Sequence, residues 1–250
     1  MARILRVLRD PEGPCAYLPD AVASLEHRVA LDVSPEQLEA WLERGWRRFG
    51  PDYFRPACPA CEACVPVRID VEAFRPSASQ QRVWKRANAF RLEYGSPEVD
   101  ERRLELFRHW HENRSLARGW ERQEMLPEHY RMQFAFPHPA ARELAFYDGD
   151  RIVGVSICDE TPNALSAAYF FYDPAYAKAS LGTLNVLSLI SVARESGKRF
   201  LYLGFLVADC HSLRYKGRFG ARERLSGWPR DDEASHWTPE TRLSTEPAPE

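Results

Sequence analysis

Residues 164–205 read ALSAAYFFYDPAYAKASLGTLNVLSLISVARESGKRFLYLGF. The start of this stretch is rich in aromatic residues and predicts a strand over residues 164–172. Residues 182–196 show an apolar helix pattern, which Gly197 ends because glycine favours the close of a helix. Residues 200–205 then predict another strand. The stretch therefore predicts a strand, a loop, a helix and a second strand.

A hairpin precedes this stretch. Residues 142–147 and 151–158 predict two strands, and Asp148-Gly149 between them is a hairpin turn signal. Helices are predicted over residues 98–118 and 127–134. A central strand that splays and is followed by a helix N-terminus is typical of the GNAT acyltransferases. We therefore expect an α+β fold of the GNAT-like acyltransferase type.

Four cysteines lie in the first quarter of the chain, three of them with the spacing C-x2-C-x2-C: Cys15, Cys58, Cys61 and Cys64. Four thiolates can close a tetrahedral zinc site or hold an iron–sulfur cluster. The alternatives are two disulfides or buried, inert thiols. The first eight residues do not resemble a signal peptide, so we expect a reducing compartment in which disulfides are rare. The spacing therefore favours a metal or a cluster. Cys158 and Cys210 lie in apolar surroundings and are expected in the core or in the lining of a site.

The chain has 250 residues and a formal net charge of −2, so composition gives no overall basic signature. No run of eighteen apolar residues is present, and no membrane span is expected. Contact with a nucleic acid would have to come from a local basic patch. One candidate is a helix after Ser77, which opens with a possible capping box and carries Arg82, Lys85 and Arg86 on one face. The other candidate is a group beside the cysteine loop, namely Arg47, Arg48 and Arg55. The alternative interpretation is a solvated charged face.

Changes in composition and in the predicted helices and strands divide the chain into three parts. We expect a cysteine module over residues 1–95 and a transferase domain over residues 96–228. Residues 229–250 are rich in Pro, Glu, Asp, Ser and Thr, which predicts a tail without fixed structure. Inside the first part, Ser34 and Gln37 predict a helix that begins with a capping box.

Short motifs occur in a fixed order along nearly the whole folded chain. They are Cys15-Ala16-Tyr17-Leu18, Gly45-Trp46-Arg47-Arg48, Tyr53-Phe54-Arg55-Pro56, the C-x2-C-x2-C loop, Pro66-Val67-Arg68, Phe74-Arg75-Pro76-Ser77-Ala78-Ser79-Gln80-Gln81-Arg82, Phe170-Phe171-Tyr172-Asp173-Pro174, Ser180-Leu181-Gly182-Thr183, Tyr202-Leu203-Gly204 and Tyr215-Lys216. This ordered set resembles the bacterial aspartate/glutamate leucyltransferases, the prokaryotic branch of the arginyltransferases of the N-degron pathway.

The resemblance implies a reaction, its partners and a fold. Leucine would pass from leucyl-tRNA to the α-amino group of a protein that begins with Asp or Glu, and the new terminus would mark that protein for degradation in the cytoplasm. The family's GNAT-like fold agrees with the strand and helix pattern described above. Arginine from arginyl-tRNA is the alternative donor, although the apolar run Phe205-Leu206-Val207 fits leucine better. The sequence leaves the oligomeric state open.

Three residues are candidates for the catalytic step. Tyr169 and Tyr172 end the aromatic strand, and Asp209 follows the next one. A carboxylate at position 209 could accept the proton from the incoming amine, and the alternative is that it caps the next helix. An aminoacyl ester is already activated, so proximity and oxyanion stabilisation suffice without a Ser/His/Asp triad.

Two further groups are candidates for substrate binding. Gly182 and Thr183 open a helix whose free N–H groups could meet a phosphate or the ester of tRNA, or could form an ordinary helix start. Arg68 and Lys216 are candidates for the cation that binds the acceptor's carboxylate.

Two competing functions remain at this stage. An acetyl-CoA-dependent N-acetyltransferase would need a glycine-rich pyrophosphate loop, of which only Gly182 is present, so no coenzyme A is expected. A non-catalytic RNA-binding protein would explain the cysteines and the basic helix, but would leave residues 169–174 and 180–183 without a purpose.

Overall fold

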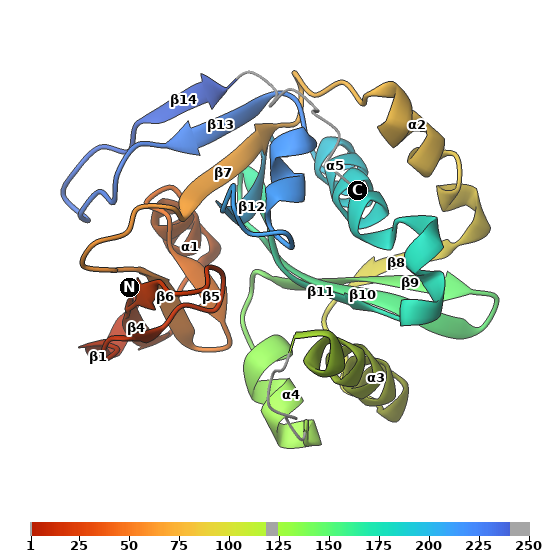
Figure 1. Ribbon diagram of the computed structural model, residues 1–250, viewed down its shortest axis with the longest axis horizontal. Helices are drawn as coiled ribbons and strands as arrows, with labels where there is room; N and C mark the ends of the chain where they lie inside the picture. Colours follow the sequence, from red (N-terminus) through yellow and green to blue (C-terminus); the bar gives the residue numbers. More distant parts are fainter. Residues whose placement is uncertain (1, 119–124, 241–250) are drawn as a thin grey trace.

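The computed structural model describes residues 2–118 and 125–240, and its centre is a mixed sheet of eight strands (Figure 1). In spatial order the strands are β14 (Trp237–Glu240), β13 (Arg222–Leu225), β7 (Val65–Asp70), β12 (Phe200–Leu206), β11 (Ala164–Tyr172), β10 (Arg151–Glu160), β9 (Ala141–Asp148) and β8 (Arg91–Gly95). The pair formed by β11 and β12 is parallel, and the other neighbouring pairs are antiparallel. Helix α5 connects β11 to β12, as a parallel pair requires a crossover.

A smaller sheet lies beside the large one (Figure 1). Its strands, in spatial order, are β1 (Arg3–Arg9), β4 (Leu25–Leu31), β6 (Asp52–Pro56) and β5 (Arg47–Phe49), and β2 (Gly13–Pro14) pairs with β3 (Val22–Ala23) nearby. Helix α1 (Pro35–Leu42) packs on this sheet through Leu38, Trp41 and Leu42, which are buried with Tyr53. The cysteine loop joins β6 of the small sheet to β7 of the large sheet.

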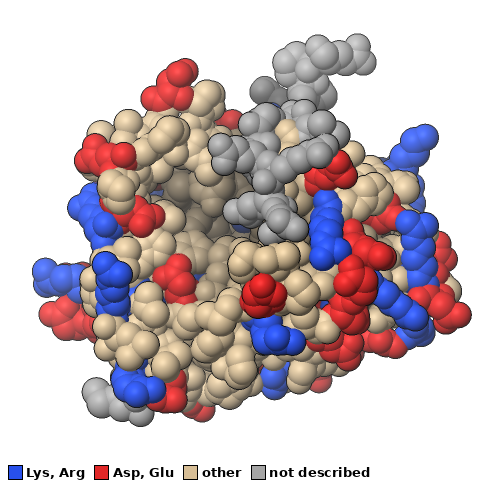
Figure 2. Space-filling model, turned by 90° about the horizontal axis from the view of Figure 1, so that it is seen from below, with Lys and Arg blue, Asp and Glu red and all other residues tan. Residues whose placement is uncertain are grey.

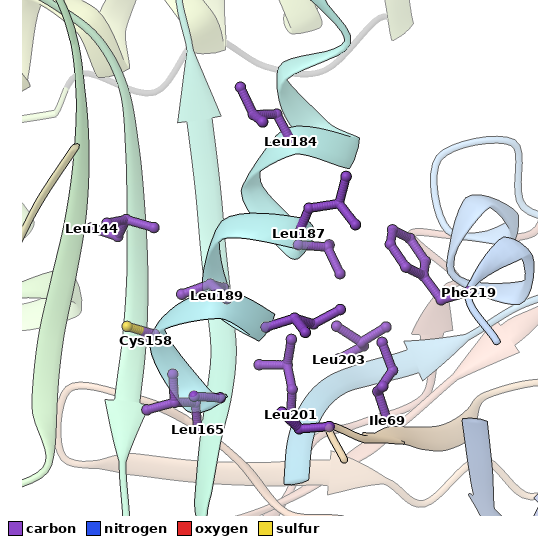
Figure 3. Close-up of a cluster of buried hydrophobic side chains, with 14 of the residues drawn as sticks. Ile69, Leu144, Cys158, Leu165, Leu184, Leu187, Leu189, Leu201, Leu203 and Phe219 are labelled. Atoms are coloured by element: carbon purple, nitrogen blue, oxygen red, sulfur yellow. The ribbon is translucent and has the colours of Figure 1, made fainter. Parts of the chain in front are cut away.

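Helices cover both faces of the large sheet (Figure 1). One face carries α5 (Leu181–Glu195) and α2 (Ala78–Trp84), and the other carries α3 (Glu101–Arg118) and α4 (Pro127–Phe134). The short 3-10 helices are η1 (Ala87–Ala89), η2 (Pro174–Ala179) and η3 (Arg214–Arg218). Figure 3 shows Leu187 of α5 in one buried cluster with the strand side chains Leu201 and Leu203. Each fully buried leucine contributes about 1.5–3 kcal/mol, so this contact holds α5 in place.

The elements expected around the central stretch are confirmed. Gly149, at φ +58°, forms the turn of the predicted β9–β10 hairpin. Ser77 caps α2 with a full capping box. Ser34 caps α1, but the side chain of Gln37 accepts a hydrogen bond from the backbone N–H of Ala2, so the second half of that predicted box is missing.

The predicted division at residue 95 does not coincide with a break in the fold. Strands β7 and β8 precede that residue, yet both belong to the eight-stranded sheet. The observed architecture is a mixed α/β fold with one large mixed sheet, to which the first 95 residues contribute two strands. In the described part of the chain, no helix is both long enough and apolar enough to span a bilayer.

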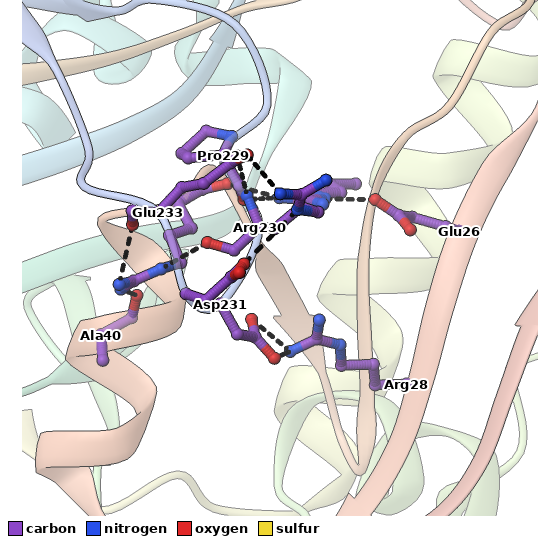
Figure 4. Close-up of polar contacts among 10 residues, drawn as sticks. Glu26, Arg28, Ala40, Pro229, Arg230, Asp231 and Glu233 are labelled. Carbon is purple, nitrogen blue, oxygen red and sulfur yellow. Dashed lines mark hydrogen bonds and ion pairs between the residues drawn. The ribbon is translucent and has the colours of Figure 1, made fainter.

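The prediction of an unstructured tail from Pro229 is wrong for the part up to Glu240. Residues 228–240, here called the C-terminal strap, end in strand β14 and contact the small sheet (Figure 4). Arg28 forms an ion pair with Asp231 at 2.9 Å, and Arg55 donates a hydrogen bond to the carbonyl oxygen of Pro229 at 2.8 Å. Composition did not reveal these contacts because their partners come from the N-terminal part. The remaining predicted tail, residues 241–250, lies outside the described residues.

Candidate active site

The neighbouring parallel strands β11 and β12 separate along their length. Their ladder pairs residues 164–166 with residues 200–202, but β11 continues to Tyr172 and β12 to Leu206. Strand β12 is also irregular at Gly204, where the register with β7 shifts and φ is +75°. The carboxyl halves of the two strands therefore carry backbone groups that they do not pair with each other, and other partners have to satisfy them.

Arg47 of β5 fills this opening. Its Nη2 atom donates hydrogen bonds to the carbonyl oxygens of Ala167 at 2.5 Å and Ala168 at 3.2 Å. On the other side, a Cβ atom at position 204 would lie 2.4 Å from Nη1, so glycine is needed there to leave room. Nη1 itself is buried and has no hydrogen-bond partner among the described residues. One edge of the guanidinium is thus unsatisfied, which is rare for a buried polar atom.

Lys216 of η3 lies close enough to Arg47 for their charges to interact. Its Nζ atom donates a hydrogen bond to the carbonyl oxygen of Phe205 at 2.8 Å. Burial, helped by the positive charge of Arg47, lowers the pKa of Lys216 to about 7, although Cys210 and Cys64 act in the opposite direction. The lysine is therefore partly protonated at neutral pH and would become fully protonated beside an anion.

Among the described residues, the surroundings of these two cations supply no free carboxylate. No ion pair between described residues includes Arg47 or Lys216. Asp159 attracts Arg47 electrostatically, but its carboxylate forms a buried ion pair with Arg48. Burial raises the pKa of nearby Tyr17, so that phenol is neutral at pH 7. The opening between β11 and β12 is thus locally positive.

The two cations are only partly exposed, and burial is the first cause of the pKa shift of each. Figure 2 shows a hollow on the face of the molecule seen from below, with mostly uncharged side chains around it.

The predicted tyrosines lie on the part of β11 that leaves β12. Tyr169 is packed against Phe134 at 5.2 Å between ring centroids, and burial raises the pKa of its phenol. Tyr172 lies 4.6 Å from the ring of Trp110. Asp209 is exposed in the turn after β12, and the residue that precedes η3 as its cap is Leu213. The alternative role of Asp209 as a helix cap is therefore not observed.

Arg68 differs from Lys216 in being fully paired. Its Nε atom is 2.7 Å from Oε2 of Glu223, and its Nη1 atom donates to the hydroxyl of Tyr202 at 3.1 Å. The guanidinium also packs on the ring of Trp237, 4.3 Å from the centroid. Its charge is already compensated, so the structure favours Lys216 over Arg68 as the free cation.

The predicted tRNA residues are exposed and lie close to the start of α5. Arg82, Lys85 and Arg86 are all exposed, and Arg86 donates a hydrogen bond to the carbonyl oxygen of Lys178 in η2 at 3.2 Å. Helix η2 leads directly into α5, where Gly182 has open space around its Cα. The hydroxyl-bearing neighbour Thr183 is in the first turn of the same helix.

The basic group beside the cysteine loop is not a surface patch. Arg48 is buried against Asp159, and Arg55 is buried against Glu26. Arg47 points into the opening between β11 and β12, although the sequence suggested it only as part of a basic patch for phosphate contact. Arg47 and Gly204 both occur in the ordered motifs, but nothing in the sequence spacing shows that they touch.

The four N-terminal cysteines gather in one region as free thiols. Burial raises the pKa of Cys64 to about 12, and the charges of Cys15, Cys58 and Cys61 raise it further. These three thiols therefore lie close enough to Cys64 for their charges to interact with it. In the described residues, no three Cys, His, Asp or Glu side chains are arranged to hold a metal ion. Four neighbouring thiols are nonetheless the donor set that zinc or an iron–sulfur cluster uses. Cys158 and Cys210 are both buried, which agrees with the expectation that they lie in the core or in the lining of a site.

Comparison with known proteins gives two family matches. Residues 13–82 match the N terminus of arginine-tRNA-protein transferase, and residues 102–226 match its C terminus. The aspartate/glutamate leucyltransferase of Helicobacter hepaticus is 31% identical over 224 residues, which cover 89% of this chain and 93% of the relative. That of Aeromonas hydrophila is 33% identical over 236 residues, with 89% and 92% covered. Among solved structures, L-PGS from Bacillus licheniformis is 15% identical and superposes with a TM-score of 0.43 over 68% of this chain and 50% of that one.

Proposed function

This chain belongs to the arginine-tRNA–protein transferase family, and we propose that it transfers leucine from leucyl-tRNA to the α-amino group of proteins that begin with Asp or Glu. The observation that carries the proposal is that relatives named aspartate/glutamate leucyltransferase match nearly the full length of both chains. In this family the new N-terminal leucine forms an N-degron, which directs the modified protein to proteolysis.

The separated strands β11 and β12 are the proposed reaction centre. The acyl group arrives as an activated ester, so the protein has to align it with a neutral amine and stabilise the oxyanion. Tyr172 and Asp209, at the ends of the two strands, are proposed to border the reacting groups, and Tyr169 to support them from the aromatic cluster. Such a splayed pair followed by the N-terminus of α5 supports a GNAT-like arrangement.

The donor is proposed to bind along α2 and the start of α5. Arg82, Lys85 and Arg86 are exposed cations that can contact phosphates. Gly182 and Thr183 lie in the first turn of α5, where the N–H of Gly182 can meet the terminal phosphate or the ester, whereas the N–H of Thr183 donates to the carbonyl oxygen of Ser180. Charged tRNA and newly made proteins are found in the cytoplasm, which is therefore the proposed location.

We also propose that Cys15, Cys58, Cys61 and Cys64 hold zinc or an iron–sulfur cluster. The support is the C-x2-C-x2-C spacing and the proximity of all four thiols. A bound metal would cross-link the loop between β6 and β7 to the segment around Cys15. Because metal binding and folding are coupled, Cys61→Ser should lower both the metal content and the melting temperature. If the protein as purified contains no metal and Cys61→Ser melts at the same temperature as the unchanged protein, the site is contradicted.

Transfer of labelled amino acids tests the function. Leucyl-tRNA and arginyl-tRNA are each supplied with peptides that begin with Asp, Glu or Ala. We expect leucine on the Asp and Glu peptides alone. Arginine transfer would identify the other donor, and equal transfer to the Asp and Ala peptides would refute the function. Acetyl-CoA with the same peptides tests for N-acetylation, which we do not expect.

A further inference from the structure

We propose that Arg47 and Lys216 together bind the side-chain carboxylate of the acceptor's N-terminal Asp or Glu, in the opening between β11 and β12. This inference rests on the function proposed above and identifies the part of the site that reads the acidic residue. It replaces Arg68, the sequence-predicted alternative, with an arginine that sequence reasoning did not assign to the acceptor.

The charges of Arg47 and Lys216 are uncompensated among the described residues. A buried cation is costly unless an anion or hydrogen-bond acceptors surround it. The described residues give Arg47 two carbonyl oxygens on one edge and nothing on Nη1, and they give Lys216 one carbonyl oxygen. The ion pairs of the described residues include neither side chain, while Arg68 has Glu223. A bound carboxylate would supply the missing acceptors.

The N–H donors of the two cations match the shape of a carboxylate. A carboxylate has two oxygen atoms in one plane and binds well to two convergent N–H donors. Nη1 of Arg47 offers such donors, and Nζ of Lys216 has further N–H groups beyond the one bound to Phe205. Tyr17 and Tyr215 lie close to Arg47 with the pKa of each phenol raised by burial, so both are neutral. They can donate hydrogen bonds to an anion without repelling it.

Arg47 and Lys216 reach the opening from opposite faces of the large sheet. Strand β5, which carries Arg47, lies on the α3–α4 face, where Phe49 packs against Phe134. Lys216 belongs to η3, and its neighbour Tyr215 packs on the α5 cluster, on the face that also carries the proposed tRNA contacts. A carboxylate that contacts both cations would therefore lie in the opening itself, between the two faces.

The test compares acidic peptides with their neutral amide counterparts. Transfer of leucine to peptides that begin with Asp or Asn, and with Glu or Gln, is measured as kcat/KM at saturating leucyl-tRNA. The variants are Lys216→Met, Arg47→Met and the charge-preserving Lys216→Arg. Arg224→Met is the matched control, since Arg224 is a half-exposed arginine on β13, which lies between β14 and β7. Leucyl-tRNA affinity and melting temperature are measured for each protein.

We expect the unchanged protein to prefer Asp over Asn. Lys216→Met and Arg47→Met should each lower kcat/KM for the Asp and Glu peptides about tenfold to a hundredfold, the factor for one lost charge-assisted hydrogen bond. The ratio of kcat/KM for the Asp peptide to that for the Asn peptide should fall by the same factor, while the affinity for leucyl-tRNA should stay the same. Lys216→Arg should keep most of the preference, and Arg224→Met should keep all of it.

The outcomes separate this inference from the function itself. If the unchanged protein prefers Asp and Lys216→Met keeps that preference, the function stands and the inference is wrong. If Lys216→Met loses affinity for leucyl-tRNA with the preference intact, the cations serve a phosphate of the donor and the inference is equally wrong. If the unchanged protein shows no preference for acidic peptides, the proposed function fails. Arg47→Met removes two hydrogen bonds to β11, so if it does not fold, Lys216→Met decides.

Discussion

His27 is held between two carboxylates in the small sheet. Its Nδ1 atom lies 3.0 Å from Oδ1 of Asp52, and its Nε2 atom lies 3.1 Å from Oδ2 of Asp10. Burial by itself would lower the pKa of His27, but hydrogen bonds to the two carboxylates outweigh it, and the pKa is raised above its ordinary value. The protonated ring thus links strand β4 to β6 and to the end of β1.

This contact predicts a pH dependence of stability. A histidine with a raised folded pKa stabilises the fold fully below its unfolded pKa of about 6.5, and that stabilisation is lost as the pH rises through the folded pKa. Asp10 and Asp52 are 43% and 37% exposed, so we expect an effect of about 1 kcal/mol or less. His27→Gln should be less stable than the unchanged protein at pH 6 and nearly equal to it at pH 9. Urea unfolding at both pH values measures this, and a constant difference would contradict it.

Helix α2 combines a buried side with an exposed basic side. Gln80 is buried, and Val83 packs on the core beneath α5. A seven-residue helix is too short to be stable alone, so its capping box and its packing on α5 hold it in place. Changes to its exposed charges should therefore leave the fold intact, which makes this element suitable for testing the tRNA surface.

We predict that reversing the charges of Arg82 and Lys85 to Glu weakens tRNA binding. Each lost phosphate contact should reduce the slope of log affinity against log salt by about 0.9. The matched control is Arg102→Glu on α3, because that helix lies on the opposite face of the large sheet. Binding measured over a series of salt concentrations gives the slope. An unchanged slope for the α2 variant, or an equal change for the control, would place the tRNA elsewhere.

At the scale of the whole molecule, the sequence predicted what local signals determine. The hairpin of β9 and β10, the strands β11 and β12 and the helix α5 follow from apolar periodicity, Asp148-Gly149 and Gly197. The small sheet was not predicted, since β5 has only three residues and β1 pairs with β4 across the segment that holds β2 and β3. In the site, single residues such as Lys216 could be proposed from motifs. The contact of Arg47 with Gly204 could not, because it arises only when β5 packs on the large sheet.

The C-terminal strap was also not predicted from the sequence, because its contacts are with distant parts of the chain. It joins the two sheets. The indole N–H of Trp237 donates to the carbonyl oxygen of Glu43, just after α1, at 3.1 Å. The same ring contacts Tyr202 of β12 edge-on, with centroids 5.6 Å apart, and lies under Arg68 of β7. One side chain therefore bridges the small sheet's helix and the large sheet. The family match ends at residue 226, so this bridge lies outside it.

We predict that Trp237→Ala destabilises the protein by about 2 kcal/mol. A fully buried tryptophan costs about 3–5 kcal/mol when truncated, and Trp237 is only half-buried but also loses a hydrogen bond and a cation–π contact. For a chain of this size the melting temperature should fall by about 4–8 °C. Trp84→Ala is the control, because Trp84 is exposed on α2 and should cost less than half as much. If both variants melt alike, the strap is only a surface covering, and the position of the small sheet, with Arg47 on it, must depend on the direct contacts of β5 with β11.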